Sequence, residues 1–281
     1  SGICSFTSMG GNATRIYFDT GSRYCLVAYL LSLYFFLTSS GKKRWLWVAC
    51  MALFITGIFI AYSRAQYLGS VLAMLLTLAL LLAKQKQLFR KTLTAALISL
   101  AAACLLLSAL SVLQRTNLFK VAYYRVAISA PIEGTSSEDE SKQWLDYDSE
   151  GDSLTVRQEK IRLLEQSIKK HWLAGGGLGS AINYDDGYVE YTYHDIVNKM
   201  GVIGLVLFFA PFVIMAVLLF RKRGKENKPR DFLLGIVSLA SIFYFLFIAY
   251  FNPCMSSTVG ISCYVLTMSA FSLEFSPMDG N

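Results

Sequence analysis

Charged residues and histidine are scarce in this chain of 281 residues, whereas apolar residues are abundant. Asp, Glu, Lys and Arg make up 16% of the chain, apolar residues make up 54%, and only two residues are histidine. The mean hydropathy is +0.46. This balance excludes an ordinary soluble domain of this length. We therefore expect a membrane protein.

The start of the chain lacks the features of a signal peptide. Its first residues, SGICSFTSMGGNATRIYFDTGSR, are polar, contain no basic n-region and do not begin with Met. We therefore expect a fragment whose earlier helices are missing.

Clear motifs for metal or nucleotide binding are also missing. The stretch 133–153 is acidic, rich in Ser and poor in aliphatic residues, which is typical of a flexible, solvated strand. A metal site of carboxylates is the alternative, but no ligand spacing stands out. The glycine-rich stretch AGGGLGS, 174–180, lacks the Lys and Ser/Thr of a P-loop. It is either a helix stop with a tight turn or a cradle for phosphate.

The six cysteines indicate little about function. Four lie in apolar runs and are expected to behave as small hydrophobic residues, namely Cys25, Cys50, Cys104 and Cys263. The other two, Cys4 and Cys254, would face the outside. Whether they form a disulfide stays open, because the sequence does not supply the geometry.

Apolar runs of spanning length are the dominant feature of the chain. A bilayer core requires about 20 residues of helix, and the runs lie at 24–40, 45–62, 66–83, 92–113, 194–220, 231–251 and 254–274. We therefore predict an all-α polytopic protein with about seven transmembrane helices. Its expected parts are 1–113 with the first four helices, a large outer loop at 114–193, and 194–281 with the last three helices.

The short basic loops predict the orientation. The sequences GKKR at 41–44, KQKQLFRK at 84–91 and RKRGKENKPR at 221–230 fall on one side if the helices alternate, and such loops stay in the cytoplasm. The long segment 114–193 then lies outside. The net charge of +7 is explained by these loops, so nucleic-acid binding is not expected.

An amphipathic helix is expected within the outer loop, at 154–172. Ser153 or Thr155 is available as its N-cap, and Thr155 to Gln158 has the spacing of a capping box. An apolar stripe runs through Ile161, Leu164, Ile168 and Trp172. One step back along the stripe stands Arg157, which would face inward. Arg162 lies instead on the flank beside Glu159 and Glu165, where an exposed ion pair needs no functional explanation.

The polar start of the fifth span carries candidate functional residues. Thr192 is a possible N-cap, which puts His194 and Asp195 in the first turn and Asn198 one turn later on the face of His194. The positive helix end disfavours an imidazolium and Asp195 favours it; a neutral His194 would be a base. The nearby tyrosines Tyr184, Tyr188, Tyr191 and Tyr193 are either an aromatic belt or sugar contacts.

Arg64 stands between two spanning runs, at the outer end of both. An arginine at this depth either snorkels to water or has a partner.

In this order, the stretches YSRAQYLGSVLAMLL, VRQEKIRLLEQSIKKHWLAGGGLG and YTYHDIVNKMGVIG resemble the core of the bacterial O-antigen ligase and polymerase superfamily, over about residues 15–220. The matching positions are Ser63, Arg64, Arg157, the run Gly175 to Gly179, His194, Gly201 and Gly204. Trp172 departs from the pattern, because many members have Pro before the glycine turn.

The resemblance implies a GT-C-like glycosyltransferase on the outer face of the cytoplasmic membrane of a bacterium. Such enzymes transfer a glycan from undecaprenyl diphosphate to an acceptor hydroxyl with inversion, without a metal and without a cofactor. Arg64 and Arg157 would hold the diphosphate through their planar forks of donors. His194 would take the proton of the acceptor hydroxyl or orient it. Candidates for substrate contacts are Arg162, Asn198, Tyr191, Tyr193, Gly175 and Gly177.

The acceptor distinguishes the possible activities. A polymerase joins the glycan to another lipid-linked repeat unit, whereas a ligase joins it to the lipid A core or to a protein. We favour a polymerase, because polymerases are the more numerous and diverse members. A transporter for polysaccharide or lipid is the alternative from another class, although transporters place ionisable groups and helix breaks near mid-membrane. Pro211 is the main break that the sequence suggests in a late helix, and it has no charged neighbour. A structural scaffold would leave the inward Arg157 unexplained.

Overall fold

The computed structural model describes residues 5–8, 14–17, 21–127, 150–180, 191–221 and 229–251, together with 262, 265 and 267–269. These residues form helices apart from one short β-hairpin, so the helical class is confirmed. The chain divides into two compact units, 1–148 and 149–281, and each unit is described separately below.

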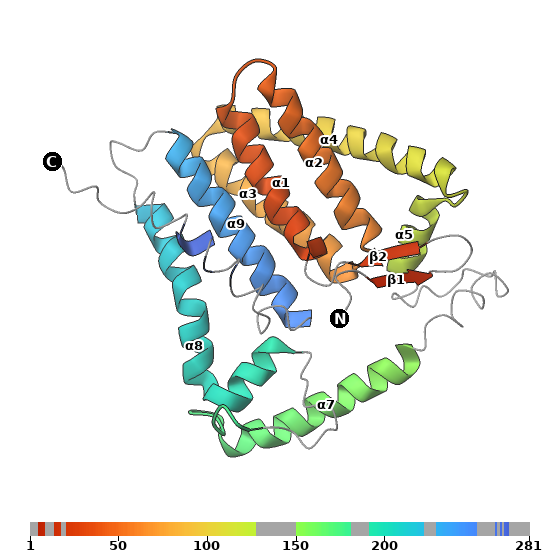
Figure 1. The fold of residues 1–281 in the computed structure, drawn as a ribbon. Coiled ribbons are helices and arrows are strands. Elements are labelled where there is room, and N and C mark those ends of the chain that lie inside the picture. The colour runs from red at the N-terminus through yellow and green to blue at the C-terminus, as the bar shows by residue number, and fades with distance from the viewer. Residues whose placement is uncertain are drawn as a thin grey trace. The chain divides into compact units, whose positions relative to one another are not determined.

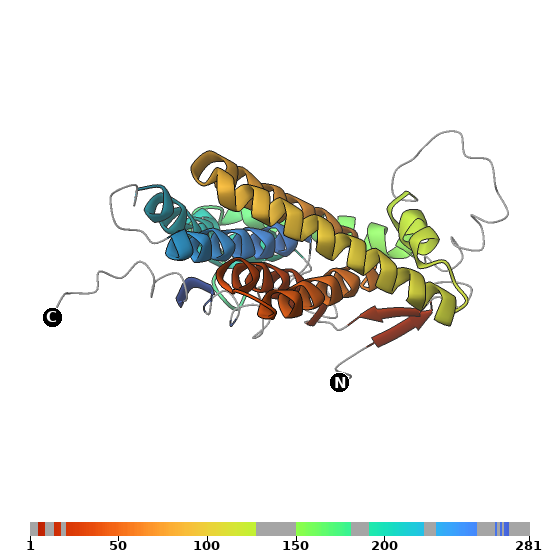
Figure 2. The same cartoon turned by 90° about the horizontal axis from the view of Figure 1, so that it is seen from above.

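The described residues of the first unit form a hairpin and five helices. Strands β1 (Ser5–Ser8) and β2 (Thr14–Tyr17) pair antiparallel, with Ser5 opposite Tyr17. The helices are α1 (Gly21–Thr38), α2 (Lys43–Ile60), α3 (Arg64–Lys84), α4 (Lys86–Leu113) and α5 (Leu118–Ala127). Figure 1 and Figure 2 show α1 to α4 side by side, with the hairpin and α5 at one end of this unit.

The second unit contains three long helices, α7 (Glu150–Lys170), α8 (Thr192–Arg221) and α9 (Pro229–Phe251). Helix α8 packs against both α7 and α9. Residues 262, 265 and 267–269 are also helical.

Six of the seven predicted spans coincide with helices, and five of these helices are long and apolar enough to cross a membrane. The five are α2, α3, α4, α8 and α9. The apolar part of α1, Ser22–Thr38, is shorter, and most of the predicted span 254–274 lies outside the described residues. The expected count of seven is therefore not confirmed, whereas a membrane protein with several spanning helices is supported.

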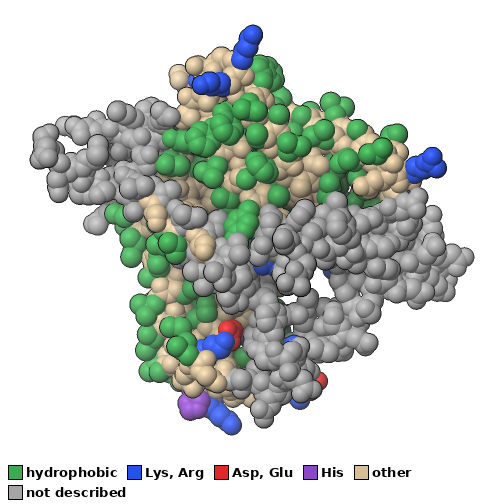
Figure 3. Space-filling view, in the orientation of Figure 1, with side chains coloured by type: hydrophobic (Ala, Val, Ile, Leu, Met, Phe, Trp, Pro, Cys, Tyr) green, Lys and Arg blue, Asp and Glu red, His purple; other side chains and the backbone are tan. Residues whose placement is uncertain are grey.

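The surface of the helices agrees with a lipid environment. On the face drawn in Figure 3, apolar side chains cover much of the upper part of the molecule, and few Lys and Arg side chains are in view there. At the end of α4, Leu113 is 80% exposed. An aqueous surface rarely carries apolar patches of this extent.

Three local predictions were wrong. The basic stretch 84–91 is no loop, because only Gln85 separates α3 from α4; its Lys, Gln, Arg and Leu residues favour helix. Helix α7 begins at Glu150, so the predicted capping box lies inside the helix and 150–153 are not an extended strand. The acidic residues at 150 and 152 suit a helix N-terminus. The predicted apolar stripe ends early, because α7 ends at Lys170 and Trp172 is 58% exposed.

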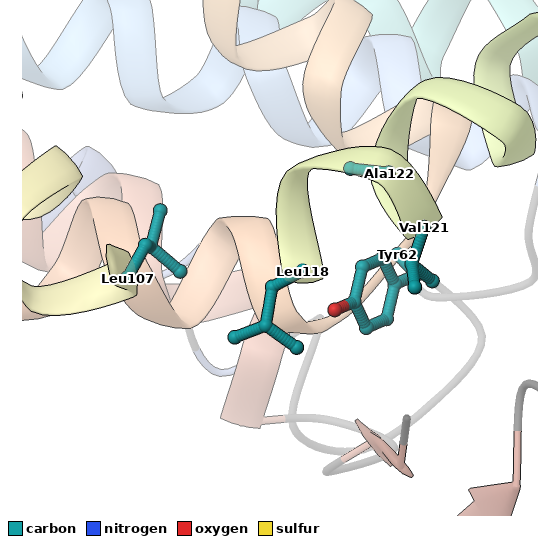
Figure 4. Close-up of a cluster of buried hydrophobic side chains, with 5 residues drawn as sticks. All are labelled: Tyr62, Leu107, Leu118, Val121 and Ala122. Atoms are coloured by element: carbon teal, nitrogen blue, oxygen red, sulfur yellow. The ribbon is translucent and has the colours of Figure 1, made fainter. Parts of the chain in front are cut away.

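A buried cluster closes the α2–α3 end of the first unit. Tyr62 lies in the turn between α2 and α3, has a left-handed φ of 46°, and is fully buried. It packs with Leu107 of α4 and with Leu118, Val121 and Ala122 of α5 (Figure 4). The turn that precedes Arg64 is therefore held from two other helices, and α5, which the sequence did not predict, supplies three of the contacts.

Candidate functional site

Helix α8 is broken at Gly201. This residue adopts φ 66° and ψ −169°, outside the helical region, and Figure 1 shows the bend in α8 after its shorter first segment. The sequence suggested Pro211 as the main break, but Pro211 stands inside the helix. Glycine tolerates a positive φ that other residues avoid. The break separates a short segment, 192–200, which carries His194 and Asn198.

The main chain at the break exchanges hydrogen bonds with the glycine-rich turn that follows α7. In an unbroken helix, the amides of residues 202 and 203 would donate to the carbonyls of residues 198 and 199. Four other bonds replace these two: Val202 N to Trp172 O at 2.9 Å, Ile203 N to Leu173 O at 3.3 Å, Gly176 N to Asn198 O at 2.8 Å and Gly177 N to Lys199 O at 3.0 Å. We call the segments 172–177 and 198–203 the joint. The amides and carbonyls that the break opens at these positions are thus paired with the turn.

Two glycines make this close approach possible. A Cβ atom on Gly201 would lie 2.1 Å from the carbonyl oxygen of Leu173. A Cβ atom on Gly175, which has a φ of 76°, would lie 2.4 Å from the carbonyl oxygen of Lys199. Both contacts are with the main chain, which cannot move aside as a flexible side chain does. The joint therefore requires glycine at both positions.

The hydrogen bonds of the turn correct the expected role of its glycines. Gly175 donates its amide to the carbonyl of His171 at 2.8 Å, and Gly177 donates to Lys199. These amides are not available to a substrate oxygen in this conformation. The glycine run was expected to be either a helix stop with a tight turn or a cradle for phosphate, and the structure supports the turn. The turn also holds α8 through its main-chain hydrogen bonds.

His194 lies in the first turn of α8 and is half-buried. Its Nδ1 atom is buried and has no hydrogen-bond partner among the residues that the structure describes. The ring of Tyr191 meets the imidazole edge to face, with the centroids 5.7 Å apart. His194 thus lies on a braced helix segment, and none of the described residues forms a hydrogen bond with its Nδ1 atom.

Asn198 stands one turn after His194, on the same face of α8. It is 3% exposed, and its Nδ2 atom lies 3.3 Å from the Oγ atom of Ser180. Its Oδ1 atom is buried and has no partner in the described part of the chain. The sequence placed Asn198 near His194, and the structure agrees with this neighbourhood.

Lys199, for which the sequence indicated no role, pairs with Asp195. The Nζ atom lies 2.8 Å from Oδ2 of Asp195, and the pair is partly buried. The Oδ1 atom of Asp195 is buried and has no partner within the described ranges. Asp195 is therefore more than a residue that favours the helix start, since it holds a lysine whose carbonyl belongs to the joint.

The two described tyrosines differ in their surroundings. Tyr191 precedes α8, is half-buried and contacts His194. Tyr193 donates its hydroxyl to the carbonyl of Leu246 in α9 and packs against Phe208, Phe209 and Tyr250. Tyr193 thus fastens α8 to α9, and its contact with substrate stays a prediction. Tyr184 and Tyr188 lie outside the described residues.

In the first unit, Arg64 is the first residue of α3 and is half-buried. Gln66, in the same turn, donates from Nε2 to the Oγ atom of Ser22 at 3.1 Å. This bond joins the first turns of α1 and α3. The first turn of α1 carries a second arginine, Arg23. Arg23 is 8% exposed. The sequence did not single out Arg23, although it stands directly before an apolar run.

The basic residues of α7 are placed unevenly. Arg157 lies within the helix, but its side chain is outside the described part. Arg162 is exposed, and its Nη2 atom lies 3.5 Å from Glu159, as the flank position predicted. Lys160, which the sequence analysis passed over, is only 6% exposed, and Leu164, one turn later, is fully buried. The inward face of α7 therefore does carry a basic side chain.

The described residues contain no group of three or more His, Cys, Asp or Glu side chains that would hold a metal ion. Cys25 is half-buried and Cys50 and Cys104 are free thiols, while Cys4, Cys254 and Cys263 lie outside the described ranges. No protein-family model matches the chain, and the searches of curated proteins and of solved structures found no match either. Function must therefore be argued from the site.

Proposed function

We propose that this chain is an integral membrane glycosyltransferase of the O-antigen ligase and polymerase type. It transfers a glycan from undecaprenyl diphosphate to an acceptor hydroxyl on the outer face of the bacterial cytoplasmic membrane. The activity that we favour is that of a polymerase, with a second lipid-linked repeat unit as the acceptor.

The observation that carries this proposal is the state of His194. A general base needs a free lone pair and a fixed position next to the proton that it removes. The buried Nδ1 atom of His194 has no partner among the described residues, and its helix segment is braced by the joint. A neutral His194 would take the proton as the acceptor oxygen attacks the anomeric carbon.

Positive side chains would stabilise the leaving group. The bond between the anomeric carbon and the diphosphate oxygen breaks as the new glycosidic bond forms, and negative charge collects on the diphosphate. Arginine suits this task because its planar fork of donors matches phosphate oxygens. Arg64 and Arg157 are the residues that the family resemblance assigns to this role.

The joint disfavours the transporter alternative. Transporters of the broken-helix type use the open amides and carbonyls of the break to bind ions and substrates. In α8 the carbonyls of Asn198 and Lys199 accept hydrogen bonds from Gly176 and Gly177 instead. The break in α8 therefore serves as a structural connection to the turn after α7, in which both carbonyls already have a protein partner.

The test replaces His194 by Ala and, separately, Arg157 by Ala in the full-length protein. The chain length of the glycan and the amount of accumulated lipid-linked repeat units are compared on gels at equal protein levels. Loss of a general base is expected to lower the rate by about 10²–10⁴-fold. His171 provides the matched control, because it is the other histidine and its side chain is exposed at the end of α7; His171→Ala should leave the chains unchanged.

The same gels separate the possible acceptors. A polymerase defect leaves single repeat units on their acceptor, whereas a ligase defect leaves long chains on the lipid carrier. Long chains at normal levels in both the His194 and the Arg157 variant would refute the proposed catalytic roles.

A further inference from the structure

We infer that the start of α8 contains a subsite for hydroxyl groups of the acceptor glycan, in which Asn198 is a binding residue. This inference rests on the proposed function, since it identifies what lies beside His194 as the acceptor. The subsite consists of the Oδ1 atom of Asn198 and the Nδ1 atom of His194, one helical turn apart on one face of α8.

The hydrogen bonds of Ser180 determine how the Asn198 amide is oriented. The Oγ atom of Ser180 lies 3.4 Å from the main-chain carbonyl oxygen of Asn198. A carbonyl oxygen only accepts, so the hydroxyl hydrogen of Ser180 is donated there. The Oγ atom is then an acceptor for the Nδ2 group of Asn198, at 3.3 Å. The amide nitrogen is therefore directed to Ser180, and Oδ1 is directed away from it.

The Oδ1 atom requires a donor. Asn198 is 3% exposed, and Oδ1 is buried without a partner among the described residues. A buried acceptor that stays unsatisfied is unfavourable, which is why such groups in folded proteins nearly always have a partner. The Nδ1 atom of His194 is buried and unpartnered in the same sense. Because Oδ1 only accepts, it favours a ligand that brings hydrogen-bond donors, and a neutral His194 with its proton on Nε2 would offer Nδ1 as a second acceptor.

This requirement separates the two parts of the substrate. The diphosphate of a lipid carrier offers acceptor oxygens, which would be repelled by a second acceptor. Sugar hydroxyls offer donors, and a site built to bond a hydroxyl discriminates strongly against a ligand that lacks it. The start of α8 therefore takes the hydroxyl-bearing acceptor, and the diphosphate binds to arginine side chains instead.

The test measures binding of two probes to the full-length protein in lipid nanodiscs. One probe is a phosphate-free oligosaccharide cut from the polysaccharide of the producing cell, and the other is undecaprenyl diphosphate. Asn198→Leu removes the acceptor and is expected to weaken binding of the oligosaccharide by about tenfold. Asn198→Asp keeps an acceptor oxygen but loses the Nδ2 donor to Ser180 and buries a charge, so it should weaken binding of the oligosaccharide less than Asn198→Leu does. Binding of undecaprenyl diphosphate should be unchanged in both variants.

Two controls keep this test decisive. Met200→Leu changes an exposed side chain of the same segment by a similar volume and should bind both probes normally. If Asn198→Leu does not fold, Ser180→Ala replaces it, because the amide then loses the partner that orients it; a loss of binding of a few fold is expected for the oligosaccharide alone.

The subsite is refuted if the wild type does not bind the oligosaccharide, if Asn198→Leu binds it as the wild type does, or if the variant loses both probes together. The proposed function fails separately. Normal binding of the oligosaccharide together with no glycan transfer by the wild-type protein would overturn the glycosyltransferase and leave the subsite in place.

Discussion

The Cα atom of Gly201 lies so close to the main chain of Leu173 that a Cβ atom there would be 2.1 Å from the Leu173 carbonyl oxygen. These residues belong to a broken membrane helix and to the turn after an amphipathic helix, and their contact is what lets the two main chains exchange hydrogen bonds. The first segment of α8, with His194, is held in place from α7 by this contact.

Two glycines of the joint, and Gly204 just after it, should not tolerate alanine. Gly201→Ala and Gly175→Ala both meet main-chain atoms at positive φ, and each should lower the free energy of unfolding by about 1–3 kcal/mol or more. Gly204→Ala has no positive φ to overcome, but its Cβ atom would lie 2.2 Å from the Cβ atom of Met200, whose position is set by the main chain, so this change should destabilise as well. Thermal unfolding in detergent, followed by circular dichroism, provides the comparison.

Gly179→Ala is the matched control for this series, because nothing lies within 4 Å of its Cβ position and no positive φ is involved. It should unfold at the temperature of the wild type. Equal midpoints for Gly201→Ala and Gly179→Ala would contradict the described joint.

Tyr193→Phe should loosen the contact between α8 and α9. The hydroxyl of Tyr193 donates to the carbonyl of Leu246. The substitution removes this hydrogen bond and keeps the contacts of the ring. We expect a destabilisation of about 1 kcal/mol, measured as a lower midpoint of thermal unfolding. Tyr191→Phe serves as the comparison, since Tyr191 precedes α8 and contacts His194 through its ring; a larger effect of Tyr191→Phe would speak against this role of Tyr193.

Tyr62 predicts a loss of stability at alkaline pH. Burial disfavours the phenolate and raises the pKa of Tyr62 from 10.0 to about 12. Because the pKa of Tyr62 is raised in the folded state, the contribution of its protonated form to the free energy of unfolding is fully present below pH 10. This contribution is lost as the pH rises through about 12. The free energy of unfolding should fall by about 2–3 kcal/mol over this window.

Tyr62→Phe isolates this effect, because phenylalanine fills the same cluster and does not titrate. At neutral pH the variant should be as stable as the wild type or slightly more stable, since the Tyr62 hydroxyl is buried without a partner among the described residues. Denaturant titrations at pH 8 and pH 11 would compare the two proteins. An identical pH dependence in both would show that Tyr62 is not the cause.

The Asp195–Lys199 pair should show coupling in a double-mutant cycle. Lys199→Met leaves the carboxylate of Asp195 partly buried without its cation at 2.8 Å, and adding Asp195→Asn should recover part of the loss. A partly exposed pair of this kind contributes about 1 kcal/mol or less, so we expect a coupling energy of that size from thermal unfolding midpoints. Strict additivity of the two single changes would mean that the pair contributes nothing.

Much of the helical architecture was predictable because it depends on local properties of the chain. The spans 45–62 and 231–251 correspond to α2 and α9 within a few residues, since a long apolar run forms a helix in lipid whatever its neighbours are. Boundaries failed where propensity outweighed charge, as at Gln85, where a basic stretch that resembles a loop is helical.

The candidate site was predictable only in part. The sequence placed His194 and Asn198 on one face because helical spacing is local. It did not indicate that the glycine amides are occupied, that Tyr193 bonds to α9, or that Lys160 and Arg23 are buried, because each of these depends on a partner or a neighbour from another part of the chain.

The sequence by itself determined that this is a helical membrane protein, where most of its spanning helices lie, and which side chains head the late helix α8. Only the tertiary structure decided that Gly201, and not Pro211, breaks this helix, and that the turn at 172–177 repairs the break. The physical reason is that hydropathy and propensity act within a segment, whereas the joint needs hydrogen bonds between main-chain groups 22 or 30 residues apart. No local pattern specifies which carbonyl such an amide will meet.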